Sequence, residues 1–306
     1  LADRVRFIDA TEQDKSFAAL EPHYLWLVAR GLRRNDTIVA IGGGVVQDIT
    51  CFIASTLMRG VRWTLIPTTL LAQCDSCIGS KSSINIGAYK NQLGTFYPPH
   101  EVLLCSDVLA TLPADEIRSG LGEAVKLHLL ESDAAVVAVE ATLASLARQS
   151  FPDTDVLGDI VRRSLALKKP YIEEDEFDRG RRHVLNYGHT FGHAYEAVTD
   201  YAIPHGIAVT LGMLTATFVS FRLGLVDEGH AQRVAALLRP LYEPYEQLLR
   251  QEHIDAVVEA MRHDKKNDGN DITCILTRGC GAMSRERIAA ETLRGVLGER
   301  FAAATG

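Results

Sequence analysis

The chain has 306 residues, 47% of them hydrophobic and 23% charged, as in a globular protein long enough for about two domains. A formal net charge of −7 argues against a broad basic surface for nucleic acid, so a small-molecule ligand is expected. The longest uncharged stretch, residues 206–221, is shorter than the ~20 residues of a membrane span. It predicts a buried helix, and we expect no membrane association.

The first third of the sequence predicts alternating strands and helices. TIVAI (37–41) predicts a strand, GGG (42–44) a turn, residues 45–58 a helix and VRWTLI (61–66) a second strand. A further strand is expected at EVLLCSD (101–107). A glycine-rich turn between strand and helix can present backbone N–H groups to a phosphate, although three glycines can also form a simple tight turn.

From about residue 111 the pattern becomes helical. Helices are expected at 114–131, 133–148, 154–169, 188–199, 206–224, 230–242, 254–265 and 288–304, and ITCIL (272–276) is the one further strand. The sequence therefore predicts an α/β domain over residues 1–110 and a mostly helical domain over residues 111–306.

Polar side chains follow the predicted strand ends, where α/β sheets collect ligands. Thr68, Thr69, Asp75 and Lys81 lie in one such segment, and Lys90 with Asn91 in the next loop. The two lysines suit a polyanionic ligand, although a merely solvated loop is the alternative.

The segment LNYGHTFGHAYE (185–196) places His189 and His193 one helical turn apart, so that both imidazoles can reach one point. His205 follows at the start of another helix, and Glu123 could add an oxygen ligand. Such a set is typical of a catalytic zinc site, while neutral core histidines are the alternative. Thr190 stands where zinc proteases of the HExxH type have glutamate, which argues against that activity.

Three further charged features are present, and the first two each allow two interpretations. Glu123 and Lys126 share a helix face and by default form a surface ion pair, but their apolar flanks favour a buried one. The charge-dense segment 167–186 is a solvated loop or a source of Lys168 and Arg182 for an anionic ligand. HDKKNDG (263–269) reads as an exposed basic turn.

The six cysteines are expected to be reduced, mostly core thiols, which favours a cytoplasmic protein. The opening residues do not resemble a signal peptide. Cys74 and Cys77 form a single CxxC, which is weak support for a metal or redox centre and favours a structural role.

Taken together, these segments resemble the dehydroquinate synthase family of sugar-phosphate cyclases. The resemblance extends over nearly the whole chain and is carried, in order, by EQDKSF (12–17), GGGVVQD (42–48), MRG (58–60), PTTLLAQCDS (67–76), GSK (79–81), KNQLG (90–94), TLP (111–113), GEAVK (122–126), DEFDRGRR (175–182), LNYGHTFGHA (185–194), HG (205–206) and DKKNDG (264–269). Relative to the family, the chain is expected to lack the first strands of the nucleotide domain.

The resemblance implies a Rossmann-like NAD-binding α/β domain over residues 1–110 and a helical metal- and substrate-binding domain over residues 111–306. Enzymes of this family use NAD⁺ and a divalent metal, Zn²⁺ or Co²⁺. They oxidise a substrate hydroxyl, eliminate phosphate, reduce the ketone again and close a carbocycle by an aldol step. The implied reaction is a carbon–oxygen lyase reaction that converts a heptulosonate phosphate to 3-dehydroquinate.

The resemblance also assigns residues. The implied metal ligands are Glu123, His189 and His205, with His193 facing the substrate instead. The implied catalytic and substrate-binding residues are Asp75, Lys81, Lys90, Asn91, Lys126, Lys168, Asp178, Arg182, Asn186, His193 and Lys266, with Arg59 reaching the partner's site in a homodimer. The implied NAD-contacting residues are Glu12, Gly43, Gly44, Asp48, Thr68, Thr69, Thr111 and Leu112.

The sequence departs from the family pattern at several positions that bear on the substrate. Asp178 stands where dehydroquinate synthases carry glutamate, and HGI (205–207) replaces the usual HGE. The loop 82–91 and GTFYPP (94–99) look closer to cyclases of secondary metabolism. Arg182 and Asn186 are retained, and a guanidinium suits a substrate carboxylate. A sugar-acid phosphate is therefore the first choice of substrate.

The alternatives come from three directions. One is a cyclase of the amino-dehydroquinate, 2-epi-5-epi-valiolone or 2-deoxy-scyllo-inosose type. Another is a metal-dependent polyol dehydrogenase, which is disfavoured because the sequence offers more cationic side chains than a simple diol requires. The third is a degenerate binding or scaffold protein without activity.

Overall fold

The computed structural model describes residues 2–87, 89–146, 153–262 and 271–304. Its contacts divide the chain into two units, one of Leu1–Leu112 with Pro152–Leu165 and one of Pro113–Phe151 with Ala166–Gly306. The first is an α/β unit and the second is mostly helical, which confirms the expected fold class. Residues 152–165, which the sequence assigned to the helical domain, group with the α/β unit.

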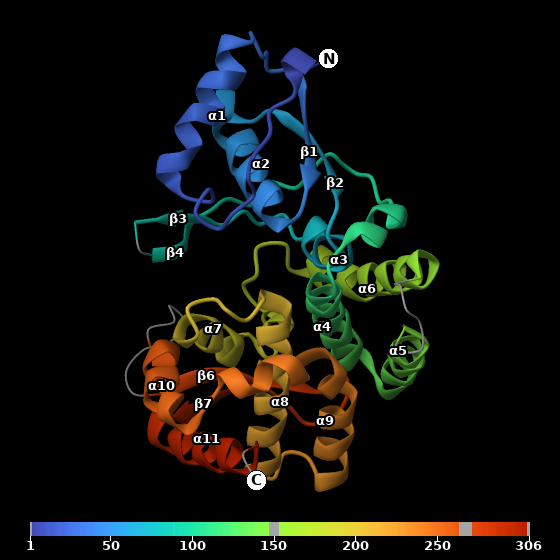
Figure 1. Ribbon diagram of the computed structural model, residues 1–306, viewed down its shortest axis with the longest axis vertical. Helices are drawn as coiled ribbons and strands as arrows, with labels where there is room; N and C mark the ends of the chain where they lie inside the picture. The colour runs from blue at the N-terminus through green and yellow to red at the C-terminus, as the bar shows by residue number, and fades with distance from the viewer. Residues whose placement is uncertain (1, 88, 147–152, 263–270, 305–306) are drawn as a thin grey trace. The chain divides into compact units, whose positions relative to one another are not determined.

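The α/β unit is organised around a parallel βαβ motif. β1 (Thr37–Gly42) and β2 (Arg62–Pro67) pair in parallel and are joined by α2 (Gly44–Thr56), with β5 (Glu101–Val102) beside β2 (Figure 1). Ala54 of α2 is buried with Trp63 and Leu65 of β2, because α2 covers one face of the sheet. The predicted strand–turn–helix–strand order over residues 37–66 is confirmed.

Several elements of this unit escaped prediction. α1 (Phe17–Ala29) packs through Leu20 against Ile49 of α2 and Ile84 of β3 (Ile84–Ile86), which forms an antiparallel hairpin with β4 (Tyr89–Leu93). The strand expected over 101–107 is wrong beyond Val102. The remaining short helices are η1 (Ala2–Arg4), η2 (Leu57–Arg59), α3 (Leu70–Cys74), η3 (Ser76–Ile78) and η4 (Ser106–Thr111).

The helical unit is built around α8 (His205–Arg222), which is buried along nearly its whole length. This confirms the buried helix predicted for residues 206–221, and no helix in the described ranges is long and apolar enough to cross a membrane. The helices around it are α4 (Ala114–Glu131), α5 (Asp133–Leu146), α6 (Thr154–Glu174), η5 (Arg181–Asn186), α7 (His189–Val198), α9 (Glu228–Tyr242), η6 (Glu243–Leu248), η7 (Gln251–His253), α10 (Ile254–Arg262) and α11 (Ala290–Ala304).

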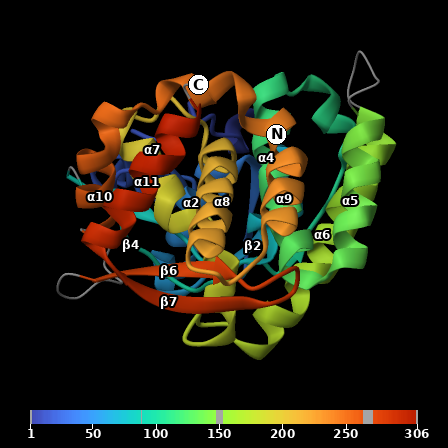
Figure 2. The same cartoon turned by 90° about the horizontal axis from the view of Figure 1, so that it is seen from below.

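An antiparallel hairpin of β6 (Asp271–Thr277) and β7 (Met283–Ala289) lies along one side of these helices (Figure 2). β6 is the predicted strand and is buried. β7 shows that the expectation of a single further strand is wrong. The strand was missed because its sequence, MSRERIA, is largely polar and half-exposed and so has no apolar pattern. Its backbone pairs with β6 along its full length, which satisfies its hydrogen bonds without an apolar pattern.

Glycines let α4, α7 and α8 cross at very short range. A Cβ atom on Gly206 of α8 would lie 1.9 Å from the Ser119 carbonyl oxygen of α4, and one on Gly212 would lie 2.0 Å from the Gly188 carbonyl oxygen. A Cβ atom on Gly122 of α4 would lie 2.5 Å from the Gly206 carbonyl oxygen. The N–H of Gly206 donates to Ser119 Oγ at 3.0 Å. The three helices are therefore held backbone against backbone.

A paired substitution tests this crossing. Gly212→Ala should lower the free energy of unfolding by ~1–3 kcal/mol or more, since its new methyl group meets fixed backbone. Gly295→Ala, in an exposed part of α11 where nothing lies within 4 Å, should be neutral or stabilise by up to about 1 kcal/mol. Denaturant unfolding measures both, and equal midpoints for the two variants would contradict the close crossing.

Candidate active site

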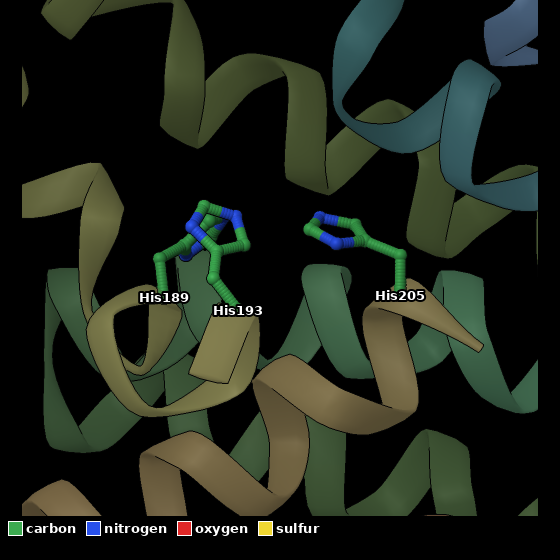
Figure 3. A group of neighbouring side chains, drawn as sticks. All are labelled: His189, His193 and His205. Atoms are coloured by element: carbon green, nitrogen blue, oxygen red, sulfur yellow. The ribbon is translucent and has the colours of Figure 1, made fainter. Parts of the chain in front are cut away.

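Four candidate metal ligands come together where α4, α7 and α8 cross. One ring nitrogen from each of His189, His193 and His205 lies within 4.8 Å of those of the others (Figure 3). Glu123 Oε1 lies 3.6 Å from His189 Nε2 and 3.6 Å from His205 Nε2. Each of these four residues has a glycine neighbour in the chain that packs against another of the three helices. The helix crossing thus fixes where the ligand atoms lie.

These distances fit a divalent metal ion. Two ligand atoms bound to one tetrahedral zinc at ~2.1 Å lie about 3.4 Å apart, close to the 3.6 Å separations around Glu123. Both carboxylate oxygens of Glu123 are buried and accept no hydrogen bond from the described residues. The Lys126 ammonium lies against Oε2, so the carboxylate has a cationic partner, and Oε1, which faces both imidazoles, is the oxygen available to a metal ion.

The three histidines are not equivalent. His189 and His205 approach the Glu123 carboxylate, whereas His193 is the most exposed member of the group. Its ring centroid lies 5.3 Å from that of His189 and 5.7 Å from that of His205. This arrangement is compatible with two metal ligands and one histidine facing a substrate, and the assignment stays a proposal.

His205 has a second carboxylate beside it, which the sequence analysis missed. Its Nδ1 lies 3.3 Å from both side-chain oxygens of Glu196. Desolvation lowers the pKa of His205, but the hydrogen bond to Glu196 and the charges of Glu196 and Glu123 outweigh it, so that the pKa is raised. The only sequence signal was the final letter of LNYGHTFGHAYE, seven residues after His189 and thus on the same helix face.

Two of the predicted cations are deeply buried in the helical unit. Lys126 is 2% exposed and forms an ion pair with Glu123, which is 1% exposed, so the default expectation of a surface pair is wrong. The physical reason is that α4 is buried on every side from Ser119 to Leu130, with α5, α8 and α9 packed against it. Lys168 is also buried, and it lies in α6, as the helix predicted over 154–169 requires. The helix continues to Glu174, so the solvated loop considered for 167–186 is wrong over its first eight residues.

The segment after α6 is organised by a single carboxylate. Asp175 accepts hydrogen bonds from the backbone N–H groups of Arg179, Gly180 and Arg182 at 2.8–3.1 Å, and these bonds hold the pKa of Asp175 below its usual value. Arg182 is buried, and its guanidinium donates to the Glu176 carbonyl. The predicted substrate residue Arg182 is thereby fixed in place on η5.

Two other predicted residues belong to this segment. Asp178 adopts a left-handed backbone conformation, with φ 54°, and its carbonyl oxygen lies 2.9 Å from His183 Nε2, where it can accept a hydrogen bond. Asn186 Nδ2 donates to the His183 carbonyl at 3.1 Å. Because η5 packs against α4, the element that carries Arg182 and Asn186 adjoins the helix of Glu123.

The predicted nucleotide residues of the α/β unit surround the start of α2. Gly43 has an extended conformation immediately before the helix, and a Cβ atom on it would lie 2.7 Å from Thr69 Cγ2. The N–H of Thr68 donates to the Gly42 carbonyl, and Thr69 caps α3 by accepting from the N–H of Ala72. The glycines thus leave the helix N-terminus uncovered, as a phosphate site requires.

A buried lysine contacts three predicted residues of the same unit. Lys15 Nζ lies 3.1 Å from Asp48 Oδ2, 3.0 Å from Asn91 Oδ1 and 3.5 Å from Glu12 Oε1. Lys90 Nζ lies 3.6 Å from the same Glu12 oxygen. Lys15 was missed as a candidate, although EQDKSF contains it, because an isolated lysine gives no sign of burial.

The remaining candidates of the α/β unit lie in its short helices and loops. Asp75 caps α3, and Lys81 Nζ lies 5.9 Å from the ring centroid of Phe96. Arg59 is exposed with φ 64°, and Asn91 has φ 53°. Left-handed backbone in non-glycine residues often accumulates at functional sites. Thr111 is exposed at the end of η4, with Leu112 next to it.

The expectations for HDKKNDG and for the cysteines have different outcomes. Lys266 and the rest of HDKKNDG fall outside the described residues. The six cysteines are thiols that form no disulfide, and both members of the CxxC are buried in the core as expected. Cys105 is exposed rather than a core thiol, because the strand predicted around it ends at Val102.

Comparison with known proteins gives the family. The N-terminal model of 3-dehydroquinate synthase matches residues 5–119 and the C-terminal model matches residues 120–267. The 3-dehydroquinate synthase of Dictyoglomus thermophilum is 39% identical over 90% of this chain and 76% of its own length. That of Streptococcus pneumoniae is 36% identical over 94% of this chain and 79% of its own length. The chain belongs to the 3-dehydroquinate synthase family and is an enzyme.

Solved structures show the same fold. A 2-epi-5-epi-valiolone synthase from Streptomyces hygroscopicus with NAD⁺ and Zn²⁺ bound is 27% identical, with a TM-score of 0.81 over 97% of this chain and 82% of that one. A 2-deoxy-scyllo-inosose synthase complexed with carbaglucose-6-phosphate, NAD⁺ and Co²⁺ has a TM-score of 0.84 at 24% identity, over 96% of this chain and 82% of that one. A probable glycerol dehydrogenase from Sinorhizobium meliloti, 14% identical, has a TM-score of 0.61 over 95% of this chain and 82% of that one.

Asp48 generates a pH-dependent prediction. Desolvation raises the pKa of Asp48 to about 6, although Lys15 and the N–H of Ser83 partly offset it. A raised carboxyl pKa means that the folded state loses stability as the pH rises through the window from about 4 to about 6, by up to ~3 kcal/mol.

Asp48→Asn removes this titration. Relative to the unsubstituted protein, the variant should therefore gain free energy of unfolding between pH 4 and pH 7, by up to ~3 kcal/mol. Urea unfolding at both pH values measures this difference, and the comparison cancels any constant cost of the substitution. A stability difference that is the same at both pH values would contradict the raised pKa.

Proposed function

We propose that this enzyme is a 3-dehydroquinate synthase, a carbon–oxygen lyase that converts 3-deoxy-arabino-heptulosonate 7-phosphate to 3-dehydroquinate with release of phosphate. The observation that carries the proposal is the cluster of Glu123, His189 and His205, with buried Lys126 beside it. The identity of 36–39% to 3-dehydroquinate synthases, against 24–27% for the cyclases described above, supports this substrate over theirs.

The proposed cofactors are NAD⁺ and a divalent metal, Zn²⁺ or Co²⁺. When bound, the metal would polarise a substrate hydroxyl as a Lewis acid, and NAD⁺ would take up and return a hydride. Glu123, His189 and His205 would hold the metal. The residues that would bind NAD⁺ are Glu12, Gly43, Gly44, Asp48, Thr68, Thr69, Thr111 and Leu112, around the N-terminus of α2 and its neighbouring loops.

The chain's own residues would bind and orient the substrate. Arg182 offers a planar guanidinium for the carboxylate, and its backbone is already fixed by Asp175. Lys126 and Lys168 are buried cations, which attract anionic groups more strongly than exposed ones do. His193, the exposed histidine, would hold or transfer a proton at a ring nitrogen that faces the substrate.

Further residues complete the proposed site. Asn186, Asp178, Asp75, Lys81, Lys90, Asn91 and Lys266 are proposed substrate contacts, and Arg59 is proposed to act across a homodimer interface. Its exposure and left-handed backbone are compatible with that role. A cytoplasmic location is proposed as well, supported by six cysteines that remain thiols rather than forming disulfides.

One observation favours a second candidate function. Asp178 replaces the glutamate expected of a dehydroquinate synthase, and the fold matches two secondary-metabolism cyclases with TM-scores of 0.81 and 0.84. A cyclase for another sugar phosphate is therefore the alternative. A polyol dehydrogenase is disfavoured, because a simple diol offers no anion for Lys126, Lys168 and Arg182.

A substrate panel decides between these functions. The full-length protein with NAD⁺ and Zn²⁺ or Co²⁺ should release inorganic phosphate from the heptulosonate phosphate and yield 3-dehydroquinate, identified by NMR. Sedoheptulose 7-phosphate and glucose 6-phosphate, which lack a carboxylate, should release none. Phosphate release from sedoheptulose 7-phosphate but not from the heptulosonate phosphate would refute the assignment.

The carboxylate of Asp175 gives a second prediction. Asp175→Ala removes the acceptor for three backbone N–H groups and should displace Arg182. Because small misplacements of binding groups are costly, kcat/KM for the heptulosonate phosphate should fall roughly ten- to a hundredfold, mainly through KM. Steady-state kinetics measure the effect. Asp159→Ala, an exposed acid of α6 paired with Arg162, is the control and should leave the kinetics unchanged.

A further inference from the structure

Glu196 lies on the same face of α7 as two of the clustered histidines. His189, His193 and Glu196 are spaced by four and three residues in one helix, so their side chains form a single row. His205 belongs to α8 and faces this row. The Glu196 carboxylate, 14% exposed, lies 3.3 Å from His205 Nδ1 through either of its oxygens.

The turn between α7 and α8 creates this pairing. Asp200 and Tyr201 both have left-handed backbone, with φ 50° and 60°. The N–H of Tyr201 donates to the Glu196 carbonyl at 2.7 Å, which ties the turn to the end of α7. The chain therefore reverses so tightly that His205, nine residues after Glu196, returns to its side chain.

The two ring nitrogens of His205 face different carboxylates. Nδ1 faces Glu196, whereas Nε2 lies 3.6 Å from Glu123 Oε1. An ionised carboxylate can only accept hydrogen bonds, so Nδ1 must carry a proton to bond with Glu196. In the neutral ring this leaves the lone pair on Nε2, which is the nitrogen beside Glu123.

We propose that Glu196 is a positioning residue for the metal site: it holds the Nδ1–H of His205 and thereby presents Nε2 as a metal ligand. The inference rests on the metal site of the proposed function and adds a residue to it. Without the carboxylate, rotation of the ring would be free to exchange Nδ1 and Nε2, and part of the population would present the wrong nitrogen. Hydrogen-bond partners of this kind change metal affinity by about 10–100-fold.

Glu196 is not itself placed to bind the same ion. Its oxygens contact His205 on the Nδ1 side, whereas Glu123 and His189 approach from the Nε2 side. Its contribution therefore passes through His205. That distinction makes the role testable by removing His205.

Metal affinity is the first readout, because it requires neither NAD⁺ nor substrate. Competition with a chromogenic chelator gives the Kd for Zn²⁺ and Co²⁺, and circular dichroism verifies folding. Glu196→Ala should weaken binding about 10–100-fold. Glu196→Gln, whose amide oxygen can still accept from Nδ1–H, should lose clearly less. Glu140→Ala, an acid paired with Arg233 in the same unit, is the matched control and should bind like the unsubstituted protein.

A double-mutant cycle separates positioning from a general structural effect. His205→Ala should weaken metal binding strongly, and Glu196→Ala should then add little further loss. In the zinc form, the slowly exchanging Nδ1–H proton of His205 should appear in NMR spectra of ¹⁵N-histidine-labelled protein and vanish in Glu196→Ala.

The outcomes are distinguishable. Unchanged metal affinity in folded Glu196→Ala overturns the inference, as does an equal loss with and without His205. If Glu196→Ala fails to fold, Glu196→Gln is used for the test instead. If Glu196→Gln then weakens metal binding as much as His205→Ala does, the hydrogen-bond role is refuted. Failure of the unsubstituted protein to bind either ion instead refutes the metal site of the proposed function.

Discussion

The close crossing of α4, α7 and α8 is the constraint on which the candidate site depends. Glycines at the crossing allow backbone contact that any side chain would prevent, and each candidate ligand has one of these glycines as its neighbour in the chain. The positions of Glu123, His189 and His205 are therefore set by the helix backbones. Rigid elements of this kind hold ligands more accurately than loops do.

The second requirement is balance of charge. The site gathers buried cations and carboxylates in a small volume, and each ionised group there needs a partner. Lys126 pairs with Glu123, Glu196 pairs with His205, and Asp175 takes up three backbone N–H groups beside Arg182. In the α/β unit Lys15 has the same function for Asp48 and Asn91. The polar groups proposed to bind ligands are thus supported by others that the ligand need not touch.

The sequence predicted the βαβ motif and most helices because glycines, β-branched runs and 3.6-residue spacing are local signals. It missed α1, whose apolar residues occupy several faces and which contains Pro22. It also missed β7, whose polar sequence becomes a strand only by pairing with β6. α1 and β7 are stabilised by contacts with other elements, so local sequence patterns do not predict them.

The candidate site divides in the same way. Glu123, His189, His193 and His205 could be proposed from residue type, spacing and family resemblance, and the structure brings them together. The roles of Lys15 and Glu196 could not, because each depends on a contact across a turn or between elements. Burial was predicted only in part: the apolar flanks of Lys126 allowed a buried ion pair, whereas the charged neighbours of Lys168 gave no sign that its side chain is buried.

The ion pair between Lys126 and Glu123 makes folding independent of metal binding. An ammonium group already neutralises the one buried carboxylate among the proposed ligands, so the helices can assemble before any cation arrives. In zinc fingers, by contrast, the ligands have no such counter-charge and the apo protein is unfolded. This enzyme should therefore be a preformed receptor for its ion, which a chelator can empty and a metal salt can refill without a cycle of unfolding.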